Sequence, residues 1–271
     1  MTEEKEFLRE HNEKNSTKAT LTAADYTKNF GFEWTQIDAW NGMDLICRGH
    51  LFGRFQLSSR YFYNKDVVDV GCGNGRLGKL FFEDCKSYTG IEASNAIDNF
   101  PIPENNQNFR LIQGSATHIP LEENYADTVV CWGVLHHVDN PALAFEELIR
   151  ILKPGGEILL FIYSDGYQSR ENLTKFFNKI PSNQLYKRIS ESSDLIDKWG
   201  EIDDFYSKII TSNLSLSKKS SRAWQIFQWF DGVTPAYHWL LEKEIPMLCN
   251  KHDASFDFLG NGCYRIYLKK D

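Results

Sequence analysis

A short apolar segment that ends in a cluster of glycines constrains this chain more than any other feature. Residues 66–70 (DVVDV) have the β-branched, apolar character of a buried strand. Four glycines follow closely: Gly71, Gly73, Gly75 and Gly78. Because glycine lacks a Cβ atom, such a turn can bend sharply and lets a ligand approach its backbone. The pattern predicts a strand that enters a tight turn, with residues 76–82 continuing at helical spacing.

Further short apolar segments alternate with stretches of helical spacing. The predicted strands after the first are 88–91, 109–112, 127–132 and 157–163. Asn140 and Pro141 open the clearest helix, since asparagine is a favourable N-cap and proline fits the first helical turn. Residues 153–156 (KPGG) are expected to end that helix before the next strand. Such alternation is typical of a parallel, doubly wound sheet.

The last part of the chain has a different pattern. Residues 255–259 and 264–268 are strand-like, and Gly260-Asn-Gly262 lies between them. This turn chemistry predicts an antiparallel hairpin. We therefore expect an α/β fold with a Rossmann-like, mostly parallel, doubly wound sheet of seven strands, the C-terminal hairpin included.

Composition and charge argue against several classes of function. With 30 basic and 37 acidic residues the net charge is −7, so no overall positive field attracts phosphates, and we expect no nucleic-acid partner. The longest apolar run, 129–135, is far shorter than the roughly 20 residues of a membrane span. The charged first residues do not resemble a secretory signal. We expect a cytoplasmic protein with no membrane partner; its oligomeric state stays open.

Metal binding is not expected. The six cysteines are scattered, without a Cys-x-x-Cys pair, and are predicted to be reduced thiols. Adjacent His136 and His137 have no cluster of acidic residues beside them and are poorly placed to chelate one ion together.

The glycine turn also matches a dinucleotide-binding fingerprint. Residues 73–78 (GNGRLG) fit G-x-G-x-x-G, and Glu92 follows Gly73 by 19 residues, at the end of the second predicted strand. The glycines allow close backbone approach and the acid suits ribose hydroxyls. Any nucleoside bound at this edge needs a glycine backbone and an acidic residue, so these two features do not distinguish one nucleoside cofactor from another. An NAD-linked oxidoreductase therefore remains one interpretation.

The wider sequence resembles the class I S-adenosylmethionine-dependent methyltransferases. The stretches that carry the resemblance, in order, are 67–75 (VVDVGCGNG), 90–92 (GIE), 113–120 (QGSATHIP), 127–138 (DTVVCWGVLHHV) and 148–156 (LIRILKPGG). It covers residues 66–163 and is nearest to the ubiquinone/menaquinone-biosynthesis branch and its small-molecule methyltransferases. It implies S-adenosylmethionine as cofactor, S-adenosylhomocysteine as product, and a small-molecule acceptor methylated at O, N, S or C. A non-catalytic S-adenosylmethionine-binding scaffold is a third interpretation.

The resemblance implies a set of cofactor-binding residues. They are Asp69, Gly71, Cys72, Gly73, Glu92, Ala93, Ser115, Ala116 and Trp132. Glu92 would accept hydrogen bonds from both ribose hydroxyls. Ser115 stands where the family usually has an aspartate that reaches the adenine amino group, and a hydroxyl is a neutral, shorter acceptor. Trp132 is a candidate wall for the methionine part, because aromatic faces attract cations.

Catalytic and substrate-binding candidates lie outside the glycine turn. His136 and His137 are expected at the end of the fourth strand, where a histidine could remove a proton from the acceptor. Trp34, Tyr237 and His238 are candidate substrate contacts. The loops of the predicted sheet are too short to enclose an acceptor, so the aromatic-rich segments before and after it are expected to form a helical cap. The cap is predicted to bring Trp34 and Tyr237 nearer the methyl group than any lysine, over a small, partly apolar acceptor.

These features divide the chain into four regions. Residues 1–63 form an N-terminal helical segment that contributes to the cap, and residues 64–164 form the cofactor-binding core. Residues 165–250 form a helical insertion, the main part of the cap, and residues 251–271 supply the terminal strands of the sheet.

Overall fold

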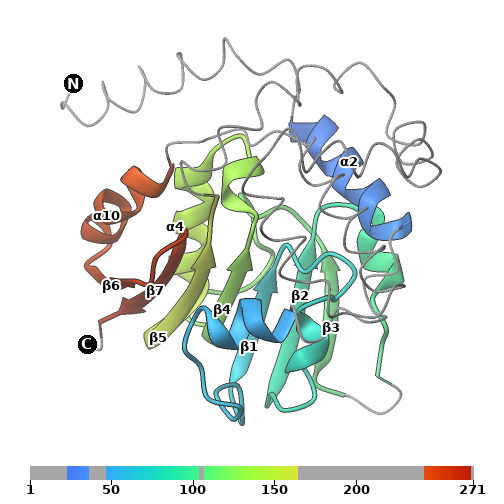
Figure 1. The fold of residues 1–271 in the computed structure, drawn as a ribbon, viewed down its shortest axis with the longest axis horizontal. Helices are drawn as coiled ribbons and strands as arrows, with labels where there is room; N and C mark the ends of the chain where they lie inside the picture. Colours follow the sequence, from blue (N-terminus) through green and yellow to red (C-terminus); the bar gives the residue numbers. More distant parts are fainter. Residues whose placement is uncertain (1–22, 37–46, 104–106, 164–240, 270–271) are drawn as a thin grey trace, which may run out of the picture.

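A single seven-stranded sheet forms the centre of the molecule (Figure 1). The computed structural model describes residues 23–36, 47–103, 107–163 and 241–269. The strands are β1 (Asp66–Val70), β2 (Ser87–Glu92), β3 (Phe109–Gln113), β4 (Ala126–Trp132), β5 (Leu152–Phe161), β6 (Ala254–Phe258) and β7 (Cys263–Leu268). Their order is β3-β2-β1-β4-β5-β7-β6; the first five run parallel, and β7 is antiparallel to both β5 and β6. The predicted fold and its C-terminal hairpin are confirmed.

The strand register brings the carboxyl ends of the parallel strands to one edge. Val70 pairs with Ile91 of β2 on one side and with Cys131 of β4 on the other. The chain order reverses at β1, because β2 follows it on one side and β4 continues on the other. In open α/β sheets the crevice outside such a switch point is where ligands bind.

Helical segments cover both faces of the sheet. In the described part of the chain the helices are α2 (Ala23–Gln36), α4 (Pro141–Ile151) and α10 (Leu241–Lys251), with shorter turns η1 (Gly49–Gly53), η2 (Gly78–Leu80), η3 (Asn95–Asn99) and η4 (Leu135–His137). Helices α4 and α10 pack on one face through buried side chains such as Phe145, Leu148 and Ile245. The other face is covered by η1 and the residues around η2, with Phe62 stacked on Phe81. None of the described helices combines the length and apolar character needed to cross a bilayer.

Helix α4 begins as the sequence predicts. The Asn140 side chain accepts a hydrogen bond from the backbone N–H of Leu143 at 3.0 Å, and Pro141 occupies the first turn. Capping satisfies one of the N–H groups that a helix leaves unpaired at its start.

The helical spacing over 76–82 does not produce a helix, which corrects the sequence prediction. The structure has only the 3₁₀ turn η2 there. Glycine has low helix propensity, and Gly75 adopts a left-handed backbone with φ of 82°. Gly78 packs so closely that an added Cβ would lie 2.4 Å from the Tyr88 hydroxyl. Packing against the aromatic side chains of this face therefore prevails over local spacing.

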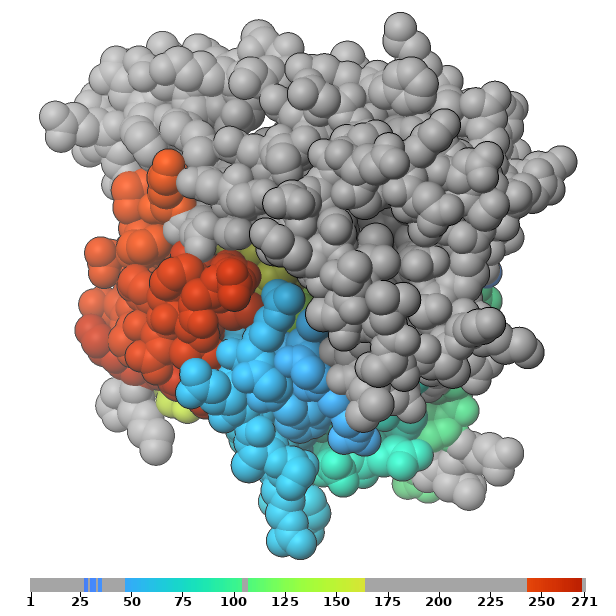
Figure 2. Space-filling model, viewed as in Figure 1, coloured from blue at the N-terminus to red at the C-terminus, as the bar shows by residue number. Residues whose placement is uncertain are grey.

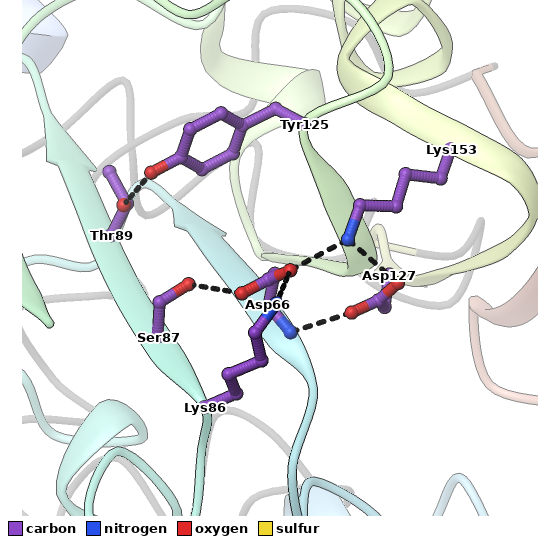
Figure 3. Close-up of polar contacts among 7 residues, drawn as sticks. All are labelled: Asp66, Lys86, Ser87, Thr89, Tyr125, Asp127 and Lys153. Carbon is purple, nitrogen blue, oxygen red and sulfur yellow. Dashed lines mark hydrogen bonds and ion pairs between the residues drawn. The ribbon is translucent and has the colours of Figure 1, made fainter.

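Residues 153–156, predicted to separate α4 from the next strand, instead form an irregularity within β5. Leu152 pairs with Ala126, whereas the next pair joins Glu157 to Thr128, so the β5 backbone bulges between them. Figure 3 shows that the bulge places Lys153 between two acids at the amino edge of the sheet.

Helix α2 lies beyond the carboxyl ends of the parallel strands (Figure 1). The Asn74 side chain donates to the backbone carbonyl of Trp34 at 3.1 Å. Gly31 packs against Ser94 and Asn95, at the start of η3. On the face shown in Figure 2, residues 47–65 lie beside the C-terminal strands, where Tyr61 contacts Arg265. Part of the N-terminal segment thus reaches the ligand-binding edge, and part packs on the sheet.

Candidate functional site

A cavity of about 250 Å³ opens at the carboxyl edge, between the loops that follow β1 to β5 and helix α2. It is lined by every predicted cofactor-binding residue: Asp69, Gly71, Cys72, Gly73, Glu92, Ala93, Ser115, Ala116 and Trp132. Trp34 and His137 also line it. Tyr237 and His238 lie outside the described residues. The fold thus brings together side chains and backbone that are dispersed over more than a hundred positions of sequence.

The glycine turn and the end of β2 are hydrogen-bonded to each other through Glu92. One carboxylate oxygen of Glu92 accepts from the backbone N–H of Gly73 at 3.0 Å, and the other from the N–H of Ser94 at 2.8 Å. The N–H of Gly71 donates to the Ile91 carbonyl at 2.7 Å. Each carboxylate oxygen has a second acceptor site, so Glu92 can still accept from vicinal hydroxyls.

Two glycines of the turn are required by backbone conformation and close approach. Gly71 has φ of 73°, and an added Cβ there would lie 2.2 Å from Cγ2 of Val134. Gly73 has φ of 55°, and its Cβ position faces the Trp34 ring at 3.6 Å. A bare backbone opposite an aromatic ring, with a carboxylate beside it, fits the nucleoside and amino-acid parts of S-adenosylmethionine.

Asp69 lies beneath this turn and is only 2% exposed. The Tyr88 hydroxyl donates to its Oδ2 at 2.8 Å. Burial raises the pKa of Asp69 to about 7, with the Glu92 charge adding to the effect and the Tyr88 hydrogen bond opposing it. The floor of the site therefore holds a carboxyl group whose charged form is disfavoured by burial.

Ser115 lies at the exposed rim, after β3. Its Oγ is 2.8 Å from Oγ1 of Thr117 and accepts from the Thr117 backbone N–H at 3.2 Å. Ala116 beside it is buried. The hydroxyl is thus oriented by its own loop at the end of the cavity where the family resemblance places the adenine.

The two adjacent histidines have different surroundings. Both belong to η4, the turn just beyond β4, and not to the strand itself. His136 is fully buried, and its Nδ1 accepts from the backbone N–H of Tyr163 at 3.3 Å. His137 lines the cavity, with its ring 4.6 Å from that of Phe30 in α2. Of the pair, His137 alone is among the described residues of the cavity wall.

Among the described residues of the cavity, three basic side chains were missed from the sequence. His50 on η1, Arg54 directly after η1, and Arg76 after the glycine turn all line it. The His50 ring stacks on Trp132 at 5.6 Å. Burial, followed by the charges of Arg54 and Arg76, lowers the pKa of His50 to about 3, so its imidazole is neutral. The four-residue spacing of His50 and Arg54 was the available signal, because it places both on one side of a helical turn.

Comparison with known proteins agrees with this geometry. Residues 68–160 match the family model described as a methyltransferase domain. A tRNA U34 carboxymethyltransferase of Nautilia profundicola is 32% identical over 136 residues, which are 47% of this chain and 40% of that protein. A ubiquinone biosynthesis O-methyltransferase of Pseudomonas fluorescens is 33% identical over 99 residues, which are 35% of this chain and 42% of that protein. An uncharacterized protein of Methanocaldococcus jannaschii is 28% identical over 213 residues, covering 67% of this chain and 92% of its own length.

The chain thus spans less than half the length of the tRNA-modifying and ubiquinone-pathway relatives that it matches. The matched region holds three of the five parallel strands of the cavity edge in full (β2, β3 and β4) and most of β1 and β5. Residues 68–160 therefore form a class I S-adenosylmethionine-dependent methyltransferase domain, the cofactor of which is S-adenosylmethionine.

Proposed function

We propose that this protein transfers a methyl group from S-adenosylmethionine to an acceptor bound over the carboxyl ends of β4 and β5. The observation that carries the proposal is the pairing of Glu92 with the Gly73 N–H at 3.0 Å, in the cavity that also contains Trp132 and His137. An acidic ribose acceptor and a bare glycine backbone, held together by one hydrogen bond, are what a nucleoside-based cofactor needs.

The strand order supports one orientation of the bound molecules. Along the edge, β3 ends near Ser115, β2 at Glu92, β1 just before Gly71 and β4 at Trp132. With the adenosine over β3 and β2, the methionine part would extend over β1, and the methyl group would face β4 and β5. The acceptor then lies on the β4–β5 side, where Trp132 and Phe161 stack at 4.4 Å between centroids.

S-adenosylmethionine would supply a methyl group bonded to a positively charged sulfur. When the nucleophilic atom of the acceptor bonds to the methyl carbon, the S–C bond would break and the sulfur would leave as the neutral thioether of S-adenosylhomocysteine. The protein must bind both molecules, align them and exclude water. The Trp132 ring provides an apolar face that also favours a nearby cation. His137 is our candidate for accepting a proton from an acceptor that carries one, and buried His136 is proposed to support it by packing, with ring centroids 4.2 Å apart.

We further propose a small molecule as the acceptor. A cavity of about 250 Å³ suits a compact ligand, and the net charge of −7 gives no general attraction for a phosphate backbone. The name of the Pseudomonas relative supports this class. The name of the Nautilia relative makes a tRNA nucleotide the second candidate, since a single base can enter a small pocket.

Calorimetry tests the cofactor assignment. S-adenosylhomocysteine is expected to bind and NAD is not. Glu92→Gln should weaken S-adenosylhomocysteine binding at least about tenfold, because it replaces a charged acceptor by a neutral one. Glu123→Gln, at an exposed position on the loop before β4, is the matched control and should bind normally. Binding of NAD alone, or equal affinities for both variants, would contradict the assignment.

The acceptor class is tested with methyl-labelled S-adenosylmethionine. The enzyme is incubated in parallel with a small-metabolite extract and with total tRNA from the source organism. Label is expected in the small-metabolite fraction. Incorporation into tRNA and not into metabolites would replace the first candidate by the second.

A further inference from the structure

A guanidinium group lies at the acceptor end of the cavity. Arg54 follows η1, and its guanidinium carbon lies 5.8 Å from the centre of the Trp132 ring and 5.4 Å from that of Phe161. These two rings end β4 and β5, beyond the strands assigned to the nucleoside and methionine parts. Among the described residues, no carboxylate forms an ion pair with Arg54.

The electrostatic surroundings leave this charge under-compensated. Arg54 is half-buried, so its guanidinium has given up part of its water, and the faces of Trp132 and Phe161 compensate that loss only in part. Of the described acids that line the cavity, Glu92 already accepts two backbone N–H groups and Asp69 is buried against Tyr88. The remaining one, Asp139, is exposed at the rim. An anionic ligand would supply the missing compensation.

The other arginine among the described residues of the cavity is placed differently. Arg76 follows the glycine turn of β1, and its guanidinium carbon lies 4.6 Å from the centre of the Trp34 ring. This position is on the side of the methionine part, which has a carboxylate of its own. Arg54, over β4 and β5, lies farther along the edge and is available for the acceptor.

We propose that the methyl acceptor carries a carboxylate and that Arg54 binds it, an inference that rests on the proposed function. A guanidinium presents a planar fork of N–H groups that matches a carboxylate, and its flat face can remain on the aromatic rings while its edge binds. Trp132, whose ring stacks on those of Phe161 and of neutral His50, forms an apolar wall beside this charge. The subsite therefore fits an aromatic or similarly apolar acid.

The test measures binding of benzoate and of its neutral isostere benzamide to the complex with S-adenosylhomocysteine, by calorimetry. Wild-type protein should bind benzoate and not benzamide. Arg54→Gln should weaken benzoate binding at least about tenfold, since one charge-assisted bidentate pair is lost. Arg54→Lys keeps the charge without the fork and should lose less, which also guards against misfolding of the glutamine variant. Arg60→Gln, at an exposed position six residues later, should bind benzoate normally.

A second titration separates acceptor binding from cofactor binding. S-adenosylhomocysteine and 5′-methylthioadenosine, which lacks the amino-acid carboxylate, are compared on wild type and Arg54→Gln. Equal affinities for S-adenosylhomocysteine in the two proteins support the proposal. If the variant weakens S-adenosylhomocysteine and not methylthioadenosine, Arg54 binds the cofactor and the proposal is overturned.

Failure of this inference differs from failure of the proposed function. If S-adenosylhomocysteine binds normally and benzoate binds equally to wild type and Arg54→Gln, or to neither, the carboxylate subsite alone is refuted. If S-adenosylhomocysteine does not bind wild type, the methyltransferase proposal itself falls, and the inference falls with it.

Discussion

Asp69 lines the cofactor cavity, and its side chain is hydrogen-bonded to buried Tyr88 of the core. Its pKa is raised to about 7, chiefly by burial, so folding keeps a proton on a carboxyl group that the unfolded chain would release near pH 4. A carboxyl group whose pKa is raised by folding stabilises the folded protein fully below its pKa in the unfolded chain. That stabilisation is lost as the pH rises through its pKa in the folded protein, here about 7. Asp69→Asn still accepts from Tyr88 but cannot ionise. The unfolding free energy of wild type should fall between pH 5 and pH 8 while that of the variant does not. The difference between the two proteins should therefore shift in favour of the variant by on the order of 2 kcal/mol over this range.

Urea unfolding of both proteins at pH 5, 7 and 8 measures this gain. Parallel pH profiles would show that the Asp69 carboxyl is already ionised in the folded protein across the range.

Two glycines of the same turn are predicted to differ in their effects. Gly75→Ala would place a Cβ 2.6 Å from the buried Phe100 ring, and should mainly lower the melting temperature. In Gly73→Val, the added Cβ would lie at an ordinary van der Waals distance from the Trp34 ring, but the rest of the valine side chain would occupy the cavity. It should reduce S-adenosylhomocysteine affinity at least about tenfold with a smaller stability loss, since one positive-φ residue costs about 1–2 kcal/mol. A folded Gly73→Val protein with normal affinity would remove the glycine turn from the cofactor site.

Sequence reasoning located these residues because their signals are local. The glycines and Glu92 lie at strand ends, and a strand end can be recognised from a few neighbouring residues. Arg54 was missed for the opposite reason. Its position in the cavity depends on η1 packing across the face of the sheet, so that Trp132, 78 residues later, becomes its neighbour.

At the scale of elements, the irregularity in β5 ties together the amino ends of four strands (Figure 3). Lys153 donates to Asp66 of β1 at 2.7 Å and to Asp127 of β4 at 2.9 Å, and Ser87 of β2 donates to Asp66 at 2.7 Å. Burial alone would raise the pKa of Asp66, but hydrogen bonds from Lys153, Lys86 and Ser87 outweigh it and lower the pKa to about 2. This cluster lies at the edge opposite the cavity.

Lys153→Met should therefore lower stability without changing cofactor affinity. A lowered carboxyl pKa contributes stability above about pH 4, and the contribution is lost as the pH falls through 2. We expect a loss of about 1 kcal/mol at neutral pH, since solvent at the rim screens the charges, and a vanishing difference near pH 2. Lys251→Met, which removes an exposed ion pair with Glu146, should cost less. Urea unfolding and S-adenosylhomocysteine titration of both variants provide the check; a binding defect in Lys153→Met would contradict the separation of the two edges.

The elements also show where sequence patterns stop being informative. The start of α4 was predicted because an asparagine cap and a proline act on their own helix. The helix expected over 76–82 was wrong because Gly78 packs onto Tyr88 of β2, a contact that no helical spacing records. The bulge in β5 is likewise a property of its pairing with β4.

At the scale of the whole molecule, the predicted cap can be followed through α2. Trp34 faces the glycine turn, Phe30 contacts His137, and Gly31 packs on Ser94 beyond β2. Most of the other predicted part of the cap, residues 165–250, lies outside the described residues; its last portion, within α10, packs against α4 and β6. Helix α2, from the N-terminal part of the chain, therefore lines the cavity, whereas helix α10 packs on a face of the sheet.

This arrangement predicts which helix responds to the cofactor. If S-adenosylhomocysteine fills the space between the glycine turn and Trp34, it should reduce the opening motions of α2, because local opening would then have to break cofactor contacts as well. Amide hydrogen exchange over residues 23–36 should slow at least about tenfold at saturating ligand, as mass action requires when only the closed form binds well. Helix α10, whose contacts are with α4 and β6, is the internal control and should exchange at an unchanged rate. Equal protection of both helices would indicate a general stabilisation of the fold, and no protection of α2 would mean that the N-terminal helix is not part of the cofactor enclosure.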